Sequence, residues 1–276
     1  MKIVANTASL FTPMEGKKLG LTILPEYVQV ENQSYRDYED ISSGEFLEML
    51  KSGSRASTSQ PAVGEVIDVL EDCGEETIML TVADGLSGEY MTAMGTKNTI
   101  ENSDRIHILD SKTLGGPLRY LVKKAALLRD QGMPVQEILR RLKSSIDSSV
   151  SYVIPADFSY LHRSGRISQM TSAVGSTLKI LPILTQSEDR RSISLISVRR
   201  SLKASVEMIE KRMQKLHVNS SYLITVAHAG AEEKAERVRG WIQKYFPETE
   251  TELLELSPSL ITHGGPGCIL VQAIQK

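Results

Sequence analysis

The first half of the sequence repeats one pattern: a short apolar run, a turn rich in Ser, Thr or Gly, and a segment with apolar residues at helical spacing. Residues 77–82 form such a run and lead through residues 83–88 to a predicted helix from Glu89. Residues 105–109 form the next predicted strand and give way to a helix through Leu128. Alternation of strands and helices predicts an α/β fold with a largely parallel sheet.

The other segments before residue 150 fit this pattern. Residues 3–5 read as a strand, and residues 20–30 as an extended stretch that Pro25 interrupts. Apolar spacing predicts a helix over residues 41–51 and another over about 135–148. The run Ser57-Thr58-Ser59-Gln60-Pro61 precedes a periodic apolar stripe and is interpreted as a helix start.

The pattern changes after Ser149. Strands are predicted over residues 152–154, 193–198, 222–226 and 251–256, and helices over 169–181, 199–216 and 231–245. Residues 158–167 are interpreted as an Arg/Gly-rich turn. We therefore expect two α/β domains, residues 1–150 and residues 151–276.

Charge and cysteine content exclude several classes of protein. The 276 residues include 32 Lys and Arg against 34 Asp and Glu, for a formal net charge of -2, which argues against binding nucleic acid through bulk positive charge. Two cysteines are too few for a disulfide scaffold or a cysteine-rich zinc site. The uncharged run over residues 256–275 contains prolines, glycines and hydroxyl residues, so we reject it as a membrane span. We expect a cytoplasmic protein with no integral membrane segment.

Hydroxyl-bearing turns are the first candidate binding feature. Thr58, Ser59 and Ser87 each stand beside an expected helix start, where free N–H groups and hydroxyls suit a carboxylate or phosphate. The plain alternative is that these residues only cap helices. Gly88 lets a ligand approach the backbone, but the sequence contains neither a P-loop nor a dinucleotide-binding glycine motif.

Two further segments are unusual. His263 and Gly264 lie in Thr262-His263-Gly264-Gly265-Pro266-Gly267, which we interpret as a glycine-rich loop. Arg166 follows a glycine in a turn where arginines could neutralise an anionic head group, or simply be solvated. The histidines show no metal-ligand spacing, so no metal site is predicted.

Taken in order, seven short motifs resemble those of the DegV family of fatty-acid-binding proteins. They span nearly the whole chain and are the opening residues 3–8, Thr58-Ser59-Gln60-Pro61, Gly85-Leu86-Ser87-Gly88, Asp110-Ser111, Tyr160-Leu161 with Ser164-Gly165-Arg166-Ile167, residues 179–184, and His263 to Gly267.

The resemblance implies two α/β domains with one long-chain fatty acid in a tunnel between them. It places Thr58, Ser59, Ser87 and His263 near the carboxylate, with the neighbouring Gly88 and Gly264, and Arg166 at the head-group mouth or kinase-docking face. It implies no catalytic residue and no cofactor in this chain. A separate ATP-binding fatty acid kinase subunit would phosphorylate the carboxylate, and the acyl phosphate would enter phospholipid synthesis.

The sequence departs from the family pattern at six positions. Asn6 replaces an acid, Ala83 and Asp84 replace serines, and Glu89 replaces a threonine. Ile261 and Thr262 stand before His263 where the family tends to have Gly-Pro. Carboxylates near an anion site would repel the ligand unless they point away. The alternatives are an interaction or regulatory protein with a vestigial lipid site, and a hydrolase that uses Ser87, His263 and Asp110.

Overall fold

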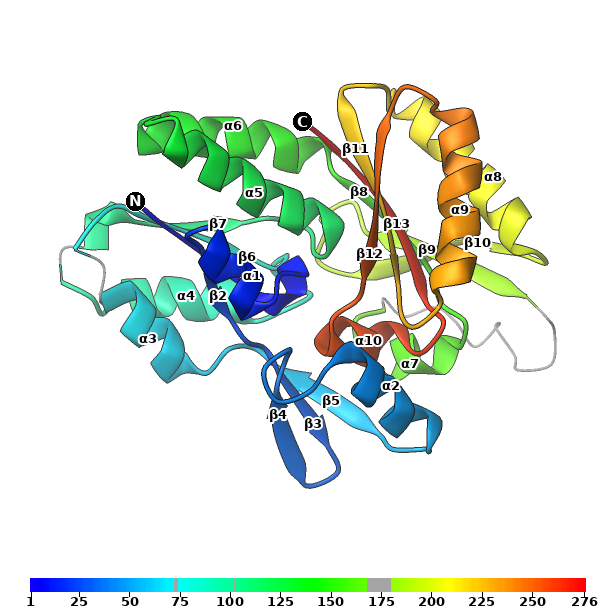
Figure 1. Ribbon diagram of the computed structural model, residues 1–276, viewed down its shortest axis with the longest axis horizontal. Coiled ribbons are helices and arrows are strands. Elements are labelled where there is room, and N and C mark those ends of the chain that lie inside the picture. Colours follow the sequence, from blue (N-terminus) through cyan, green and yellow to red (C-terminus); the bar gives the residue numbers. More distant parts are fainter. Residues whose placement is uncertain (72–73, 102, 168–179) are drawn as a thin grey trace.

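The computed structural model describes residues 1–71, 74–101, 103–167 and 180–276. These residues form three β-sheets with helices packed against them (Figure 1). The structure is a mixed α/β fold, as the alternation of strands and helices predicts.

The first sheet is parallel, with the strand order β2-β1-β6-β7. Its strands are β1 (Lys2–Asn6), β2 (Thr22–Leu24), β6 (Thr77–Thr81) and β7 (Ile106–Asp110). Successive side chains point to opposite faces: Ile3 and Ile78 share one buried cluster, and Val4 and Met79 share another. Both faces are therefore covered, as is usual for a parallel sheet.

Helices cover the two faces of this sheet. One buried cluster packs Val4 and Met79 against α3 (Val63–Glu71) and α4 (Glu89–Lys97), and the other packs Ile3 and Ile78 against α5 (Gly116–Asp130) and α6 (Val135–Ser148). The short elements of this region are α1 (Pro13–Lys18), η1 (Thr7–Ser9) and η2 (Ser103–Arg105).

The second sheet is mixed and mostly antiparallel, with the order β10-β9-β8-β13-β11-β12. Its strands are β8 (Val150–Ile154), β9 (Leu181–Gln186), β10 (Ile193–Arg199), β11 (Tyr222–His228), β12 (Glu250–Glu255) and β13 (Ile269–Gln275). The helices α8 (Leu202–Lys215) and α9 (Glu232–Tyr245) cover one face. Leu223 and Ile274 on the other face join the core that α5 and α6 form with the first sheet. The α5–α6 layer therefore packs against both large sheets.

The third sheet is small and antiparallel, with the order β4-β3-β5. It consists of β3 (Tyr27–Val30), β4 (Gln33–Arg36) and β5 (Ala56–Ser59). Its buried side chains pack with α2 (Ser43–Lys51) and α10 (Pro258–Gly264), and α7 (Phe158–Arg163) contacts α10. In Figure 1 these elements lie together below the two large sheets.

Several sequence-based expectations were wrong. Thr58 and Ser59 lie in strand β5 and not at a helix start, because residues 56–59 pair with β3. The expected turn over residues 158–167 begins with α7, which Asp157 caps. His263 lies in α10 and not in a loop, because Ser257 caps this helix and Pro258 occupies its first turn. Most of the helix expected over residues 169–181 falls outside the described residues; the structure describes residues 180 and 181, of which Leu181 begins β9. Residues 256–275, rejected as a membrane span, form α10 and β13.

Candidate ligand-binding site

A cavity lies where the three sheets and the helices α7 and α10 approach one another. The space in which a water molecule can move inside it is about 150 Å³, whereas one buried water needs about 10–15 Å³. The cavity is therefore large enough for a ligand. Its apolar lining consists of Ala8, Val82, Leu86, Leu114, Val153, Leu161, Ile193, Leu260 and Leu270.

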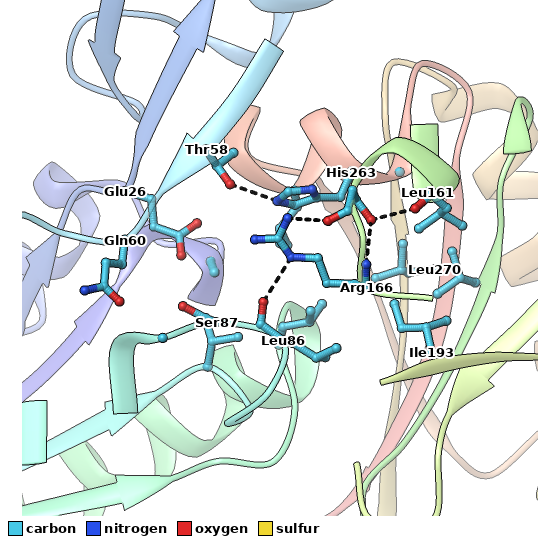
Figure 2. Close-up of a pocket in the computed structure, with 18 of the residues that line it drawn as sticks. Glu26, Thr58, Gln60, Leu86, Ser87, Leu161, Arg166, Ile193, His263 and Leu270 are labelled. Carbon is cyan, nitrogen blue, oxygen red and sulfur yellow. Dashed lines mark hydrogen bonds between the residues drawn. The ribbon is translucent and has the colours of Figure 1, made fainter. Parts of the chain in front are cut away.

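All seven candidate binding residues line this cavity. They are Thr58, Ser59, Ser87, Gly88, Arg166, His263 and Gly264. Figure 2 shows the polar side chains of Thr58, Gln60 and Ser87 on one side of the cavity and the apolar side chains of Leu161, Ile193 and Leu270 on the other. The cavity is therefore amphipathic, with hydroxyl, imidazole and guanidinium groups at one end.

Thr58 and His263 meet across the polar end. The Thr58 hydroxyl lies 2.9 Å from Nε2 of His263, although 205 residues separate them in sequence. Burial, with a smaller contribution from the positive charge of Arg166, lowers the pKa of His263 to about 3. The imidazole is therefore neutral near pH 7, with one nitrogen that donates a hydrogen bond and one that accepts. Gly264 follows His263, and an added Cβ at Gly264 would lie only 2.8 Å from Sγ of Cys268. This close approach explains why position 264 lacks a side chain.

Arg166 spans the cavity from the segment after α7. Its Nη1 donates to the Ser164 carbonyl at 2.7 Å, and its Nε donates to the Leu86 carbonyl at 3.3 Å (Figure 2). Among the described residues it forms no ion pair with a carboxylate. Neutral carbonyl groups therefore fix the guanidinium beside the polar end, where its positive charge also lowers the pKa of the lining residue Glu26 against the larger, opposite effect of burial.

Ser87 and Gly88 stand at the start of α4. The hydroxyl of Ser87 accepts a hydrogen bond from the backbone N–H of Glu89 at 3.2 Å, so Ser87 contributes to the helix start as expected. Gln60 follows β5, also lines the cavity, and donates to the Thr92 hydroxyl at 2.6 Å. Sequence reasoning did not select Gln60, although it belongs to the Thr58-Ser59-Gln60-Pro61 motif.

Glu26 is the lining residue that sequence reasoning missed most clearly. It is buried, and Nδ2 of Asn6 donates to its Oε1 at 3.1 Å and to Oε2 of Glu89 at 3.0 Å. Burial raises the pKa of Glu26 to about 7 and that of Glu89 to about 8. The only sequence signal for Glu26 is its place after Pro25, at the break between β2 and β3.

Asp84 and Glu89, the two acids that the family pattern lacks, do not face the cavity as free anions. Glu89 is not among the residues that line the cavity, and its Oε2 accepts hydrogen bonds from Asn6 and from the Val82 backbone, the latter at 2.9 Å. Asp84 forms an ion pair with Arg191. The repulsion expected from these departures is therefore reduced by a raised pKa at Glu89 and by a counter-charge at Asp84.

The structure does not assemble the Ser–His–Asp arrangement of the hydrolase alternative. His263 is bonded to Thr58, and Ser87 is bonded to the N–H of Glu89. Asp110 accepts from the backbone N–H groups of Asp84 and Lys112. None of the described hydrogen bonds links Ser87 to His263 or His263 to Asp110, so the serine has no adjacent general base.

The described residues contain neither a metal-ligand cluster nor a membrane-spanning helix. Within residues 1–71, 74–101, 103–167 and 180–276, no three His, Cys, Asp or Glu side chains gather as metal ligands. No helix in the described part of the chain is long and apolar enough to cross a membrane.

Comparison with solved structures gives close matches to the fold. A DegV family protein from Thermus thermophilus, described by its fatty acid binding, matches with a TM-score of 0.89 and 22% identity over 100% of this chain and 99% of the other. DegV from Bacillus subtilis, described as a fatty acid binding protein, matches with a TM-score of 0.86 and 23% identity over 100% and 99% of the two chains. At these identities the matches establish the fold.

Sequence comparison establishes the family. A DegV domain-containing protein of Halalkalibacterium halodurans is 30% identical over 272 residues, which cover 97% of this chain and 95% of the relative. One from Staphylococcus aureus is 27% identical over 260 residues, which cover 92% and 91% of the two chains. The family model described as "Uncharacterised protein, DegV family" matches residues 1–276. The resemblance of the motifs is confirmed, and this chain belongs to the DegV family.

Proposed function

We propose that this protein binds one long-chain fatty acid, with the carboxylate at the polar end of the cavity and the acyl chain along its apolar lining. The observation that carries the proposal is the cavity itself, which has apolar walls and ends at Thr58, His263 and Arg166. Structural relatives support it: the proteins from Thermus thermophilus and Bacillus subtilis are described as fatty acid binding, and one from Eubacterium eligens is described as loaded with heptadecanoic acid.

The proposed head-group contacts use neutral donors and one cation. A neutral His263 that carries its proton on Nε2 donates to Thr58 and leaves the threonine hydroxyl free to donate to a carboxylate. Ser59 and Ser87 add hydroxyls, Gly88 and Gly264 leave room for the head group, and Arg166 supplies the compensating positive charge. No cofactor is required for this binding.

Acyl-chain burial supplies most of the proposed affinity. Each methylene removed from water contributes about 0.8 kcal/mol, so a long chain contributes on the order of 10 kcal/mol before the ordering of ligand and protein is subtracted. The head group contributes orientation. The cavity lining comes from both sides of residue 150, for example Leu114 and Leu270, which supports two domains, residues 1–150 and 151–276, with the tunnel between them.

The same proposal assigns the chain a role as the lipid-binding subunit of a fatty acid kinase in the cytoplasm. A separate ATP-binding subunit would transfer the γ-phosphoryl group of ATP to a carboxylate oxygen of the bound fatty acid, releasing ADP. The acyl phosphate would then serve phospholipid synthesis. In this scheme the chain presents the substrate and contributes no catalytic residue.

Mass spectrometry of the purified protein tests lipid binding. We expect one fatty acid per chain in the native spectrum, lost on denaturation and recovered in an organic extract. Thr58→Val keeps the side-chain volume but removes the hydroxyl, and we expect it to lower fatty acid retention about tenfold because a charge-assisted hydrogen bond is lost. Thr99→Val is the matched control, since Thr99 is exposed and lies outside the cavity lining.

Two results would count against the proposal. A wild-type protein that carries no fatty acid and does not bind added palmitate or oleate would refute lipid binding and favour a vestigial site. Equal retention by Thr58→Val, Thr99→Val and wild type would refute the assigned head-group position. The kinase role is tested separately, by hydroxylamine trapping of acyl phosphate after the loaded protein is mixed with ATP and the ATP-binding subunit. No hydroxamate under these conditions would refute it.

A further inference from the structure

Strand β7 forms one edge of the first sheet. It pairs in parallel with β6, and no described strand pairs with its other side. The Ser111 N–H donates to the Thr81 carbonyl at 3.2 Å, so the backbone groups of Ser111, and of Leu109 two residues before it, face β6. Consecutive residues of a strand turn these groups to opposite sides, so the N–H and C=O groups of Ile108 and Asp110 face away from β6. β7 therefore offers hydrogen-bond donors and acceptors along a free edge.

An open groove follows this edge. One wall is a face of α4, where Tyr90, Met94 and Lys97 are spaced by four and three positions. The other wall is a face of α6, where Leu139 and Lys143 are spaced by four. Figure 1 shows α4 and α6 on opposite sides of β7, which lies between the two walls. The groove has a volume of about 470 Å³, against about 150 Å³ for the first cavity, and no residue lines both. We call it the β7 groove.

The lining of the β7 groove is basic. Lys97 and Lys143 line it, and neither forms an ion pair within the described part of the chain. His107 and Arg140 also line it, but each already pairs with a glutamate, at 2.7 Å and 2.6 Å. No described Asp or Glu belongs to the lining. The two lysines therefore leave a positive charge that an acidic partner can compensate.

An extended chain fits this groove. As a strand beside β7, its backbone would form hydrogen bonds with the free N–H and C=O groups of Ile108. Its side chains would alternate between the two sides of the sheet, toward α4 and toward α6. On one side they meet Met94 and Lys97, and on the other side Leu139 and Lys143. Each side combines an apolar contact with a cation, so the complementary segment carries both apolar and acidic residues.

A second copy of this chain is a poorer partner for the groove. Pairing β7 with β7 of another copy about a two-fold axis would place the same residues on both sides of the interface. Lys97 and Lys143 of both copies would then share one interface, and like charges repel. Lysines beside a free edge are also a usual means of preventing such pairing. The charge of the groove therefore favours a different, acidic chain.

We propose that the β7 groove binds an extended acidic segment of a partner protein, which adds a strand to the first sheet beside β7. Backbone hydrogen bonds hold the segment in register, and Lys97 and Lys143 select acidic residues. The proposal does not rest on lipid binding, since the groove and the first cavity share no residue.

A synthetic peptide tests the proposal. The probe has three central valines flanked by two glutamates at each end, with both ends capped and a fluorescent label attached. Whichever edge of this strand pairs with β7, valine and glutamate side chains reach both α4 and α6. Binding to wild type is measured by fluorescence anisotropy at fixed ionic strength. We expect saturable binding, and slower hydrogen exchange of the Ile108 N–H in NMR spectra of the complex.

The contribution of charge is tested on both partners. We expect Lys97→Gln and Lys143→Gln each to weaken peptide binding about threefold, the effect of one exposed ion pair, and the double variant to weaken it about tenfold. The matched control combines Lys203→Gln and Lys211→Gln on α8, which removes the same charge from exposed positions outside the groove. This control should bind the peptide as wild type does. A peptide with lysine in place of every glutamate should not bind.

Backbone pairing is tested with N-methylated peptides. Methyl groups on the third and fifth amides block one edge of the peptide, and methyl groups on the third to sixth amides block both edges. We expect the first peptide to bind through its other edge. The second should lose at least about tenfold in affinity although its side chains are unchanged, because it cannot donate hydrogen bonds to β7.

Five results would overturn the proposal. They are no binding of the valine–glutamate peptide, unchanged exchange at Ile108 when the peptide is bound, equal affinity of the peptide methylated on both edges, equal affinity of the lysine peptide, and an affinity within twofold of wild type in the Lys97 and Lys143 double variant. A concentration-dependent dimer that the peptide dissociates would assign the groove to a second copy and would also overturn it. All variants should retain fatty acid as wild type does, so this proposal and lipid binding fail independently.

Discussion

Replacing Glu89 by Gln is expected to change how the stability of the protein depends on pH. Glu89 is 1% exposed, and its Oε2 accepts hydrogen bonds from the Val82 backbone and from Asn6. Its Oε1 is buried without a hydrogen-bond partner among the described residues. A glutamine whose carbonyl oxygen takes the place of Oε2 keeps both bonds and cannot ionise.

The sign and size of the effect follow from the pKa. Burial is the main cause that raises the pKa of Glu89 from 4.5 to about 8, with the nearby Glu26 adding to the shift. The folded protein keeps this proton while the unfolded chain releases it, so the contribution of Glu89 to stability is fully present below pH 4.5 and is lost as the pH rises towards 8. Ionisation of Glu89 therefore costs the wild type about 3 kcal/mol at pH 7 and about 1 kcal/mol at pH 5.

Urea unfolding of delipidated wild type and Glu89→Gln at pH 5 and pH 7 measures this difference. We expect the free energy of unfolding of the variant, relative to wild type, to rise by about 2 kcal/mol between the two pH values. The cost of burying the new amide group is the same at both pH values and cancels. Glu26 and Asp37 also have raised pKa values, but both residues are present in wild type and in Glu89→Gln, so both proteins share their pH dependence. Parallel pH profiles would refute the reasoning, because Glu89 would then not carry a raised pKa.

Two other substitutions test packing and surface charge. Gly116→Ala places a Cβ 2.0 Å from Oγ1 of Thr225, so α5 must move from β11, and we expect a loss of about 1–3 kcal/mol in chemical denaturation. Gly95→Ala is its control, with open space around the new Cβ, and should raise stability by up to about 1 kcal/mol; matching midpoints for the two variants would contradict the contact. Asp84→Ala breaks the ion pair with Arg191, whose side chain is 57% exposed, and should cost less than about 1 kcal/mol. A thermal shift that corresponds to a loss of about 2 kcal/mol or more would show that this ion pair stabilises the protein more than a surface ion pair does.

Local sequence signals predicted the helices well where one face of the helix packs against the core. Apolar spacing predicts a helix over about 135–148, and α6 spans Val135–Ser148. The helix predicted over residues 41–51 is α2 (Ser43–Lys51), which Ser42 caps. These elements depend on residues a few positions apart, so a single sequence contains the information.

Non-local pairing caused the main errors. Ser57-Thr58-Ser59 resembles a helix start, but antiparallel pairing with β3 places residues 56–59 in a strand. His263 seemed to lie in a loop because the glycines after it dominate the pattern, whereas Ser257 and Pro258 carry a helix-start signal. The candidate residues nevertheless line one cavity. Their prediction rests on the order of seven motifs along the chain and not on the secondary structure of each motif, so the errors in secondary structure did not affect it.

The buried contacts of Asn6 with Glu26 and Glu89 explain why two departures from the family pattern, Asn6 and Glu89, are compatible with an anion site. The family motif has an acid where this chain has Asn6, and a threonine where it has Glu89. An acid at position 6 could not donate to Glu26 and Glu89, so three carboxyl groups would crowd one buried site. The Asn6 amide instead donates to both glutamates. Burial keeps the pKa of Glu26 at about 7, so near neutral pH this lining residue is partly protonated and opposes an anion less than an ionised acid would. Asn6 and Glu89 therefore act as a pair: the amide accommodates the extra glutamate, and Arg166 supplies the positive charge of the proposed carboxylate site.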